Sequence, residues 1–209
     1  MSKQKRILVV FVIVVGLYFL LSSFWQKQEP LYPANGTSIV VFGDSLAYGV
    51  GATANNDIAS RLETKLNTPV INSGVSGNTT ADALNRIDEL LKLDPKVVIV
   101  ILGGNDALRR LPIKDTFNNL EKIIVSLTDY GSAVVLVGEP GGLYGQQYEK
   151  EYERLAEEHR TFYVSNILSG LLGRPEYMSD LIHPNDSGYE MATERILPVI
   201  EEIIAKTKQ

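Results

Sequence analysis

Apolar residues after position 37 fall into short runs separated by polar, glycine-rich segments. Five of these runs are continuous and rich in β-branched side chains, as expected for strands buried on both faces of a sheet. They occupy residues 38–42, 70–72, 97–102, 133–138 and 162–164. The pattern therefore predicts five buried strands.

Helical patterns separate several of these runs. Apolar positions three or four residues apart predict amphipathic helices over residues 81–93, 116–130 and 187–206. Thr80 and Asp115 are suitable N-caps for the first two. Pro198 predicts a kink or break in the last one.

Alternating strands and helices favour parallel strands joined by crossover helices. We expect one three-layer α/β/α domain over residues 37–209. In such a sheet, functional residues gather in the loops that follow the carboxyl ends of the strands.

A further apolar run, residues 7–25, precedes the domain and contains no charged side chain. As a helix it would be about 28 Å long, close to the hydrocarbon thickness of a bilayer. Basic residues flank it, namely Lys3, Lys5, Arg6 and Lys27. We expect a transmembrane anchor with residues 1–6 in the cytoplasm and the catalytic domain outside it.

A cleavable secretory signal is the alternative interpretation of this run. Its apolar core would span residues 7–21, and residues 22–25 offer no good site of the small-x-small kind for cleavage. Either interpretation exports the domain across a membrane. Residues 26–36, with two prolines, an asparagine and a glycine, are typical of a linker.

Charge and composition narrow the range of partners. Four of the 20 basic residues lie within residues 1–27, which leaves 16 basic against 25 acidic residues and a formal net charge of −9. Such an acidic body excludes nucleic acid as an expected partner, because phosphate binding needs clustered Lys and Arg. The absence of Cys excludes disulfides, thiol catalysis and Cys-ligated zinc.

Polar loops follow the first three predicted strands, and one further polar segment precedes the last helix. Acyl transfer by serine needs a hydroxyl, a base and a carboxylate that orients the base. Ser45 in the first loop, with His183 and Asp180 in the last segment, supplies these groups. The other histidine, His159, lies at a charged helix end and is expected to be solvated.

Acyl transfer also needs hydrogen-bond donors for the developing oxyanion. The backbone N–H groups of Ser45 and Gly77 and the side-chain amide of Asn105 are candidates. Gly77 suits this role because a missing Cβ lets the backbone approach a ligand. Asp44 and Asp106 are expected to be structural hydrogen-bonding residues. For Ser45 and Asn105, the alternative interpretation is that each is only a turn residue.

These segments resemble the four signature blocks of the SGNH (GDSL) hydrolase family. The matching blocks, in family order, are Gly43-Asp44-Ser45-Leu46, Gly77, Gly103-Gly104-Asn105-Asp106 and Asp180-x-x-His183-Pro184. The similarity covers residues 38–209 and is closest to bacterial acyl-thioesterases, lysophospholipases and arylesterases. Asn78, where close relatives often have Asp, is a departure outside the expected catalytic set.

The resemblance implies a flavodoxin-like parallel sheet, a Ser45–Asp180–His183 triad and an oxyanion hole of Ser45, Gly77 and Asn105. It implies no metal and no cofactor. Leu143 and Tyr144, which follow the fourth strand, are expected to line the acyl pocket.

The expected activity is hydrolysis of a carboxylic ester or thioester by a membrane-anchored serine esterase acting on small-molecule or lipid esters. Two alternatives stay open, a deacetylase of envelope glycans on the same fold and a non-catalytic envelope binding module. A dinucleotide site at Gly49-x-Gly51 is disfavoured, since the motif starts seven residues past the strand and no acid follows the second strand to hold a ribose.

Overall fold

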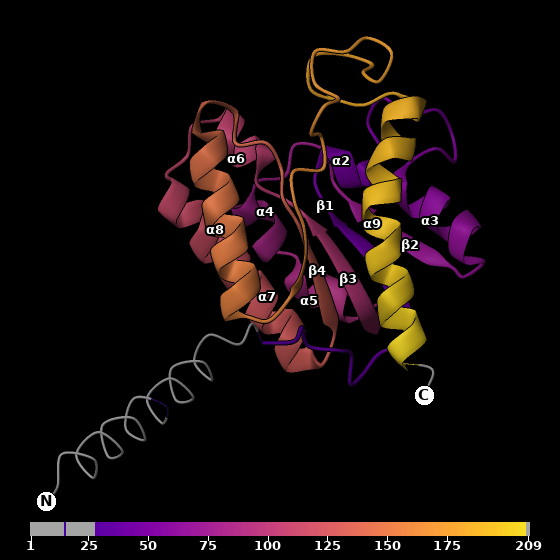
Figure 1. Cartoon of the computed structure of the whole chain (residues 1–209), viewed down its shortest axis with the longest axis vertical. Helices are drawn as coiled ribbons and strands as arrows, with labels where there is room; N and C mark the ends of the chain where they lie inside the picture. The colour runs from indigo at the N-terminus through magenta and orange to yellow at the C-terminus, as the bar shows by residue number, and fades with distance from the viewer. Residues whose placement is uncertain (1–14, 16–27, 208–209) are drawn as a thin grey trace, which may run out of the picture.

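The computed structural model describes residue 15 and residues 28–207. Five parallel strands form one sheet in the order β2-β1-β3-β4-β5, with helices on both faces (Figure 1). The strands are β1 (Ser38–Gly43), β2 (Val70–Gly74), β3 (Pro95–Ile101), β4 (Ala133–Val137) and β5 (Phe162–Val164). The predicted α/β sheet of five strands is confirmed, but β2, predicted to be buried, is an edge strand in which Ile71 and Asn72 are exposed.

Strand β1 shows why the apolar runs are continuous. Ile39 and Val41 pack on one face of the sheet, while Val40 and Phe42 pack on the other. Both faces exclude water, so neither set of alternating positions needs to be polar.

The helices divide between these two faces (Figure 1). Helices α2 (Ser45–Tyr48), α3 (Ile58–Leu66) and α9 (Asp186–Thr207) contribute to the first core. The second core takes side chains from α4 (Thr80–Leu84), α5 (Ile87–Leu91), α6 (Gly104–Leu108), α7 (Ile113–Tyr130) and α8 (Gly145–Glu158). The last of these follows a short 3-10 helix, η1 (Gly142–Tyr144).

The helix predicted over residues 81–93 is instead two short helices, α4 and α5. Arg86 lies between them, and its guanidinium donates hydrogen bonds to the carbonyl oxygens of Gly43 and Ser73 and to Asn78 Oδ1. These contacts draw Arg86 toward the carboxyl ends of β1 and β2. These tertiary hydrogen bonds therefore interrupt a segment whose own sequence pattern predicts one continuous helix.

Both predicted N-caps are wrong by a few residues. Thr79, not Thr80, caps α4 through a capping box with Asp82. The N-cap of α7 is Pro112, and Asp115 lies in the first turn of that helix. Likewise, α9 is not broken at Pro198 but continues through it to its end at Thr207.

The described chain reaches the sheet at the amino ends of the strands. Leu31 N–H donates to the Arg160 carbonyl over 2.7 Å, and Ala34 N–H donates to the Gly131 carbonyl over 2.8 Å. Both acceptors directly precede strands, β5 and β4. Residues 28–37 therefore enter the fold opposite the carboxyl ends of the strands, where the polar loops lie.

The predicted transmembrane segment, residues 7–25, lies outside the described residues apart from Val15. Within the described part of the chain, no helix has the length and apolar composition needed to cross a bilayer.

Candidate active site

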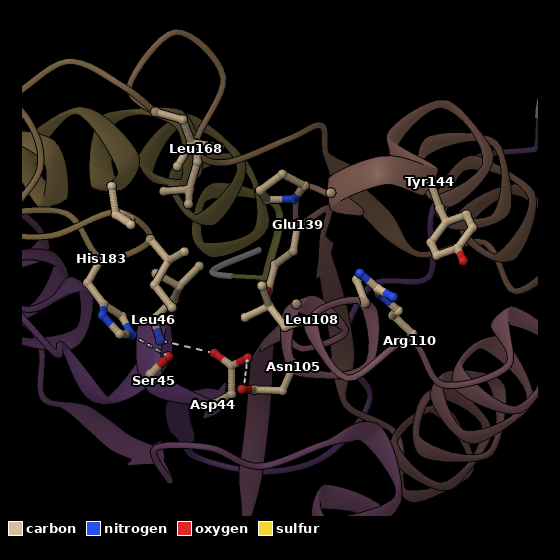
Figure 2. Close-up of a pocket in the computed structure, with 17 residues that line it drawn as sticks. Asp44, Ser45, Leu46, Asn105, Leu108, Arg110, Glu139, Tyr144, Leu168 and His183 are labelled. Atoms are coloured by element: carbon tan, nitrogen blue, oxygen red, sulfur yellow. Dashed lines mark hydrogen bonds between the residues drawn. The ribbon is translucent and has the colours of Figure 1, made fainter.

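A row of three hydrogen-bonding side chains lies at the carboxyl end of β1. His183 Nε2 is 3.1 Å from Ser45 Oγ, although 138 positions separate them, and His183 Nδ1 is 2.7 Å from Asp180 Oδ2 (Figure 2). Ser45 is the first residue of α2, two positions after the end of β1. Asp180 and His183 lie in the loop before α9. The fold thus brings together the three residues predicted to form a triad.

The Asp180 carboxylate also shapes its own loop. Its Oδ1 accepts hydrogen bonds from the backbone N–H groups of Ile182 and His183, over 2.8 and 2.7 Å. The bond with the His183 side chain, with those backbone bonds, lowers the pKa of Asp180 to about 2. The carboxylate is therefore ionised at neutral pH and faces the imidazole as an acceptor.

A glycine at position 51 allows a neighbouring loop to pack against the His183 loop. Gly51 has a φ of +93°, and an added Cβ would lie 2.1 Å from Ser179 Oγ and 2.5 Å from the Pro184 carbonyl oxygen. Gly51, the second glycine of the Gly49-x-Gly51 motif, therefore makes room for the segment that carries His183.

Asp44 and Asn105 connect the ends of β1 and β3. Asp44 is buried; its Oδ1 accepts from the Leu46 N–H over 3.0 Å and its Oδ2 accepts from Asn105 Nδ2 over 2.9 Å. Burial raises the pKa of Asp44 to about 6, against the opposing effect of these two bonds. The second amide hydrogen of Asn105 is donated to the Asn78 carbonyl oxygen over 3.0 Å.

Gly77 adopts a left-handed backbone conformation with a φ of +81°. An added Cβ would meet only the Arg109 guanidinium, at 3.8 Å, so the positive φ and not a close contact favours glycine here. Within the described part of the chain, the N–H groups of Ser45 and Gly77 have no hydrogen-bond acceptor. Gly77 is not among the residues that line the adjoining pocket.

A pocket of about 340 Å³ opens beside Ser45 (Figure 2). Its lining combines polar side chains with five leucines. The lining residues are Asp44, Ser45, Leu46, Gly104, Asn105, Ala107, Leu108, Arg110, Glu139, Pro140, Gly142, Tyr144, Leu168, Leu172, Leu181, Ile182 and His183. Tyr144 is thus one of the lining residues, while the side chain of Leu143 is outside the described structure.

Glu139 and Arg110 line this pocket but were not predicted to be site residues. Glu139 stands two positions after the end of β4, at the carboxyl ends of the strands, where Ser45 also lies. Its position after a buried strand is the signal in the sequence that could have identified it. Arg110, just beyond α6, has no comparable sequence signal.

His159 differs from its expected solvated state. Its side chain is 20% exposed, and its Nε2 lies 3.4 Å from Glu121 Oε1 in a contact between α7 and the end of α8. It does not line the pocket. In the described residues, no group of three or more acidic or histidine side chains is arranged to hold a metal ion.

The parallel α/β/α sheet and the hydrogen-bonded row of Ser45, His183 and Asp180 beside a pocket are the arrangement expected of a serine hydrolase. A family model described as the GDSL-like Lipase/Acylhydrolase family matches residues 41–191. The chain belongs to this family, and the resemblance inferred from its sequence blocks is confirmed. It is thus an ester-hydrolysing serine hydrolase.

Individual relatives agree with this placement. An arylesterase from Vibrio mimicus is 32% identical over 180 residues, covering 80% of this chain and 86% of the relative. A thioesterase 1/protease 1/lysophospholipase L1 from Escherichia coli (strain K12) is 29% identical over 161 residues, covering 73% and 77%. The crystal structure of TesA, at 27% identity, superposes with a TM-score of 0.75 and covers 80% of this chain and 99% of that one.

Proposed function

We propose that the chain hydrolyses carboxylic esters or thioesters through an acyl-enzyme formed on Ser45. The observation that carries this proposal is the continuous hydrogen-bonded row from Ser45 through His183 to Asp180 at the wall of the pocket. In such a row the imidazole takes the serine proton, and the carboxylate stabilises the imidazolium that forms.

Each step follows from these contacts. Ser45 Oγ attacks the acyl carbon while its proton passes to His183 Nε2, and the tetrahedral intermediate expels the alcohol or thiol, which takes that proton. Water then gives a proton to His183 and attacks the acyl carbon. The acid leaves and Ser45 regains its proton, so atoms and charge balance over the cycle.

The N–H groups of Ser45 and Gly77 support an oxyanion hole, because neither has an acceptor among the described residues. Asn105 joins them in this proposal by exchanging its bond to the Asn78 carbonyl for one to the oxyanion. Its second bond, to Asp44, holds the amide in place during that exchange.

The substrate class rests on the relatives and the pocket lining. The names of the relatives include arylesterase, thioesterase and lysophospholipase. Leu108, Leu168 and Leu172 give this chain an apolar wall suited to an acyl group. We infer hydrolysis of acyl esters or thioesters of small molecules or lipids.

The test uses the purified full chain with 4-nitrophenyl esters of increasing acyl length and a fluorophosphonate probe. We expect ester hydrolysis and labelling, both lost in Ser45→Ala. Ser126→Ala is the matched control, because that hydroxyl bonds to the Lys122 carbonyl within α7, outside the pocket lining. Activity retained in Ser45→Ala would reject the proposal, and release of acetate only from acetylated sugars would favour the glycan deacetylase.

We further propose that residues 7–25 anchor the enzyme with its catalytic domain outside the cytoplasm. The uncharged run and its basic flank support this location. Because residues 28–37 enter the fold at the amino ends of the strands, an anchored domain would direct its pocket away from the membrane. This orientation suits substrates that reach the enzyme from the aqueous phase.

A further inference from the structure

Glu139 is a buried acid in the wall of the pocket that the reaction steps above do not use. Its side chain is 4% exposed and lines the pocket together with Ser45 and His183. Figure 2 shows it reaching toward the side of the pocket where Asp44 and Asn105 lie. A buried carboxyl group beside leucine side chains is costly unless a hydrogen-bonding partner compensates it.

The two oxygens of the Glu139 carboxyl group differ in their surroundings. Oε2 lies over the backbone of Gly104, where an added Cβ would be 2.1 Å from it. Oε1 is buried and has no hydrogen-bond partner within the described part of the chain. A glycine thus admits the carboxyl group to this position, and the fold leaves one oxygen of that group without a partner.

The charge state of Glu139 decides what kind of partner its free oxygen suits. Burial raises its pKa well above the ordinary value, and the neighbouring Asp44 carboxylate raises it further. Asp44 accepts two hydrogen bonds, which makes it the better carrier of the shared negative charge. Burial therefore favours the neutral form of the Glu139 carboxyl group, which can donate one hydrogen bond and accept another.

We propose that Glu139 is a specificity-determining residue that selects acyl groups bearing a hydroxyl or oxo substituent over plain alkyl chains. The proposal rests on the acyl-enzyme mechanism proposed above and assigns a polar subsite within its otherwise leucine-lined pocket. A substituent oxygen pairs with the carboxyl group of Glu139. An unsubstituted acyl group leaves that carboxyl buried and unpaired, which is the condition under which enzymes discriminate strongly.

The experiment compares 4-nitrophenyl esters of butyrate, 2-hydroxybutyrate and 3-hydroxybutyrate, each kcat/KM divided by the rate constant for hydroxide-catalysed hydrolysis of the same ester. We expect the purified full chain to prefer one hydroxy ester over butyrate by about tenfold or more. Glu139→Leu should bring that ratio to one or below. Glu139→Gln should keep most of the preference, because an amide also donates and accepts.

Thr161→Val is the matched control. Thr161 Oγ1 is another buried oxygen without a hydrogen-bond partner among the described residues. It directly precedes β5, at the amino end of the strands, whereas the pocket lies at their carboxyl ends. Its replacement should leave the preference unchanged. A wild-type ratio of one or less for both hydroxy esters, or an equal ratio in wild type and Glu139→Leu, would overturn the subsite and leave the esterase intact. Absence of both hydrolysis and fluorophosphonate labelling would instead overturn the esterase proposal.

Discussion

Asn105 Nδ2 donates a 2.9 Å hydrogen bond to Oδ2 of Asp44, the residue directly before Ser45. The bond joins the carboxyl ends of β1 and β3, which are neighbours in the sheet. The other oxygen of Asp44 holds the Leu46 N–H, so one carboxylate fixes both the turn at Ser45 and the Asn105 amide. The alignment of these two groups is therefore expected to depend on Asp44.

A double-mutant cycle tests this dependence. Asn105→Ala should lower kcat by about 10²-fold, the usual effect of losing one oxyanion donor. Asp44→Ala should lower kcat by about tenfold with little change in KM, because it frees the amide without removing it. In the Asn105→Ala background, Asp44→Ala should have a smaller effect, because only the support of the turn at Ser45 is then lost. Losses in kcat that multiply in the double variant would show that Asp44 acts independently of Asn105.

Asp180 provides a second prediction. Asp180→Asn keeps the size of the side chain but removes the charge that faces His183 Nδ1. We expect kcat on 4-nitrophenyl butyrate at pH 7 to fall by about 10² to 10⁴-fold, as when a triad carboxylate is neutralised. Asp115→Asn, at an exposed aspartate in the first turn of α7, is the control and should retain wild-type kcat. Equal kcat in the two variants would argue against an orienting role for Asp180.

Gly51 is predicted to matter through the loop that carries His183. Gly51→Ala places a Cβ against Ser179 and the Pro184 carbonyl, so we expect kcat to fall by about tenfold or more as His183 moves from Ser45. Gly170→Ala introduces similar backbone strain, at φ +70°, with no heavy atom within 4 Å of the added Cβ. Comparable losses of activity in both variants would attribute the effect to backbone strain alone.

Glu139 gives a prediction on stability against pH. Its pKa in the folded chain lies well above the ordinary value of 4.5, because the side chain is buried. Between these two pKa values the folded state binds the extra proton. The contribution of Glu139 to stability is thus complete below pH 4.5 and is lost as the pH rises toward the folded-state pKa.

Thermal unfolding of wild type and Glu139→Gln from pH 4 to pH 9 measures this effect. The Tm of wild type minus that of the variant should decrease across the range by a few degrees per pH unit at most, since linkage of one proton is on the order of 1 kcal/mol per pH unit. A difference that is constant with pH would contradict the raised pKa of Glu139.

Location is tested by fractionating cells that produce the full chain. We expect the enzyme in the membrane fraction, at the intact mass of 23.1 kDa, with the domain accessible to protease added from the extracytoplasmic side. A chain starting at residue 28 is the control and should not reach the membrane. A shortened chain in the medium would instead support cleavage of a secretory signal.

Much of the fold follows from local patterns in the sequence. The strands were predictable because runs such as residues 133–138 are apolar at every position, which only a strand or helix buried on all sides tolerates. The positions of Ser45 and Asn105 followed as well, since they stand two and four residues after the ends of such strands. The break at Arg86 did not, because it depends on carbonyl groups of β1 and β2 that only the folded sheet places beside this residue.

The sequence by itself determined the order of the strands, three helical segments, the family blocks, and the residue types needed for acyl transfer. The tertiary structure decided the strand pairing, the 3.1 Å approach of His183 to Ser45 across 138 positions, and the burial of Glu139 against Gly104. The reason is physical. A strand that is buried along its whole length can be recognised from its own apolar side chains. Distances between loops and the desolvation of one carboxyl group depend instead on which other segments pack around them.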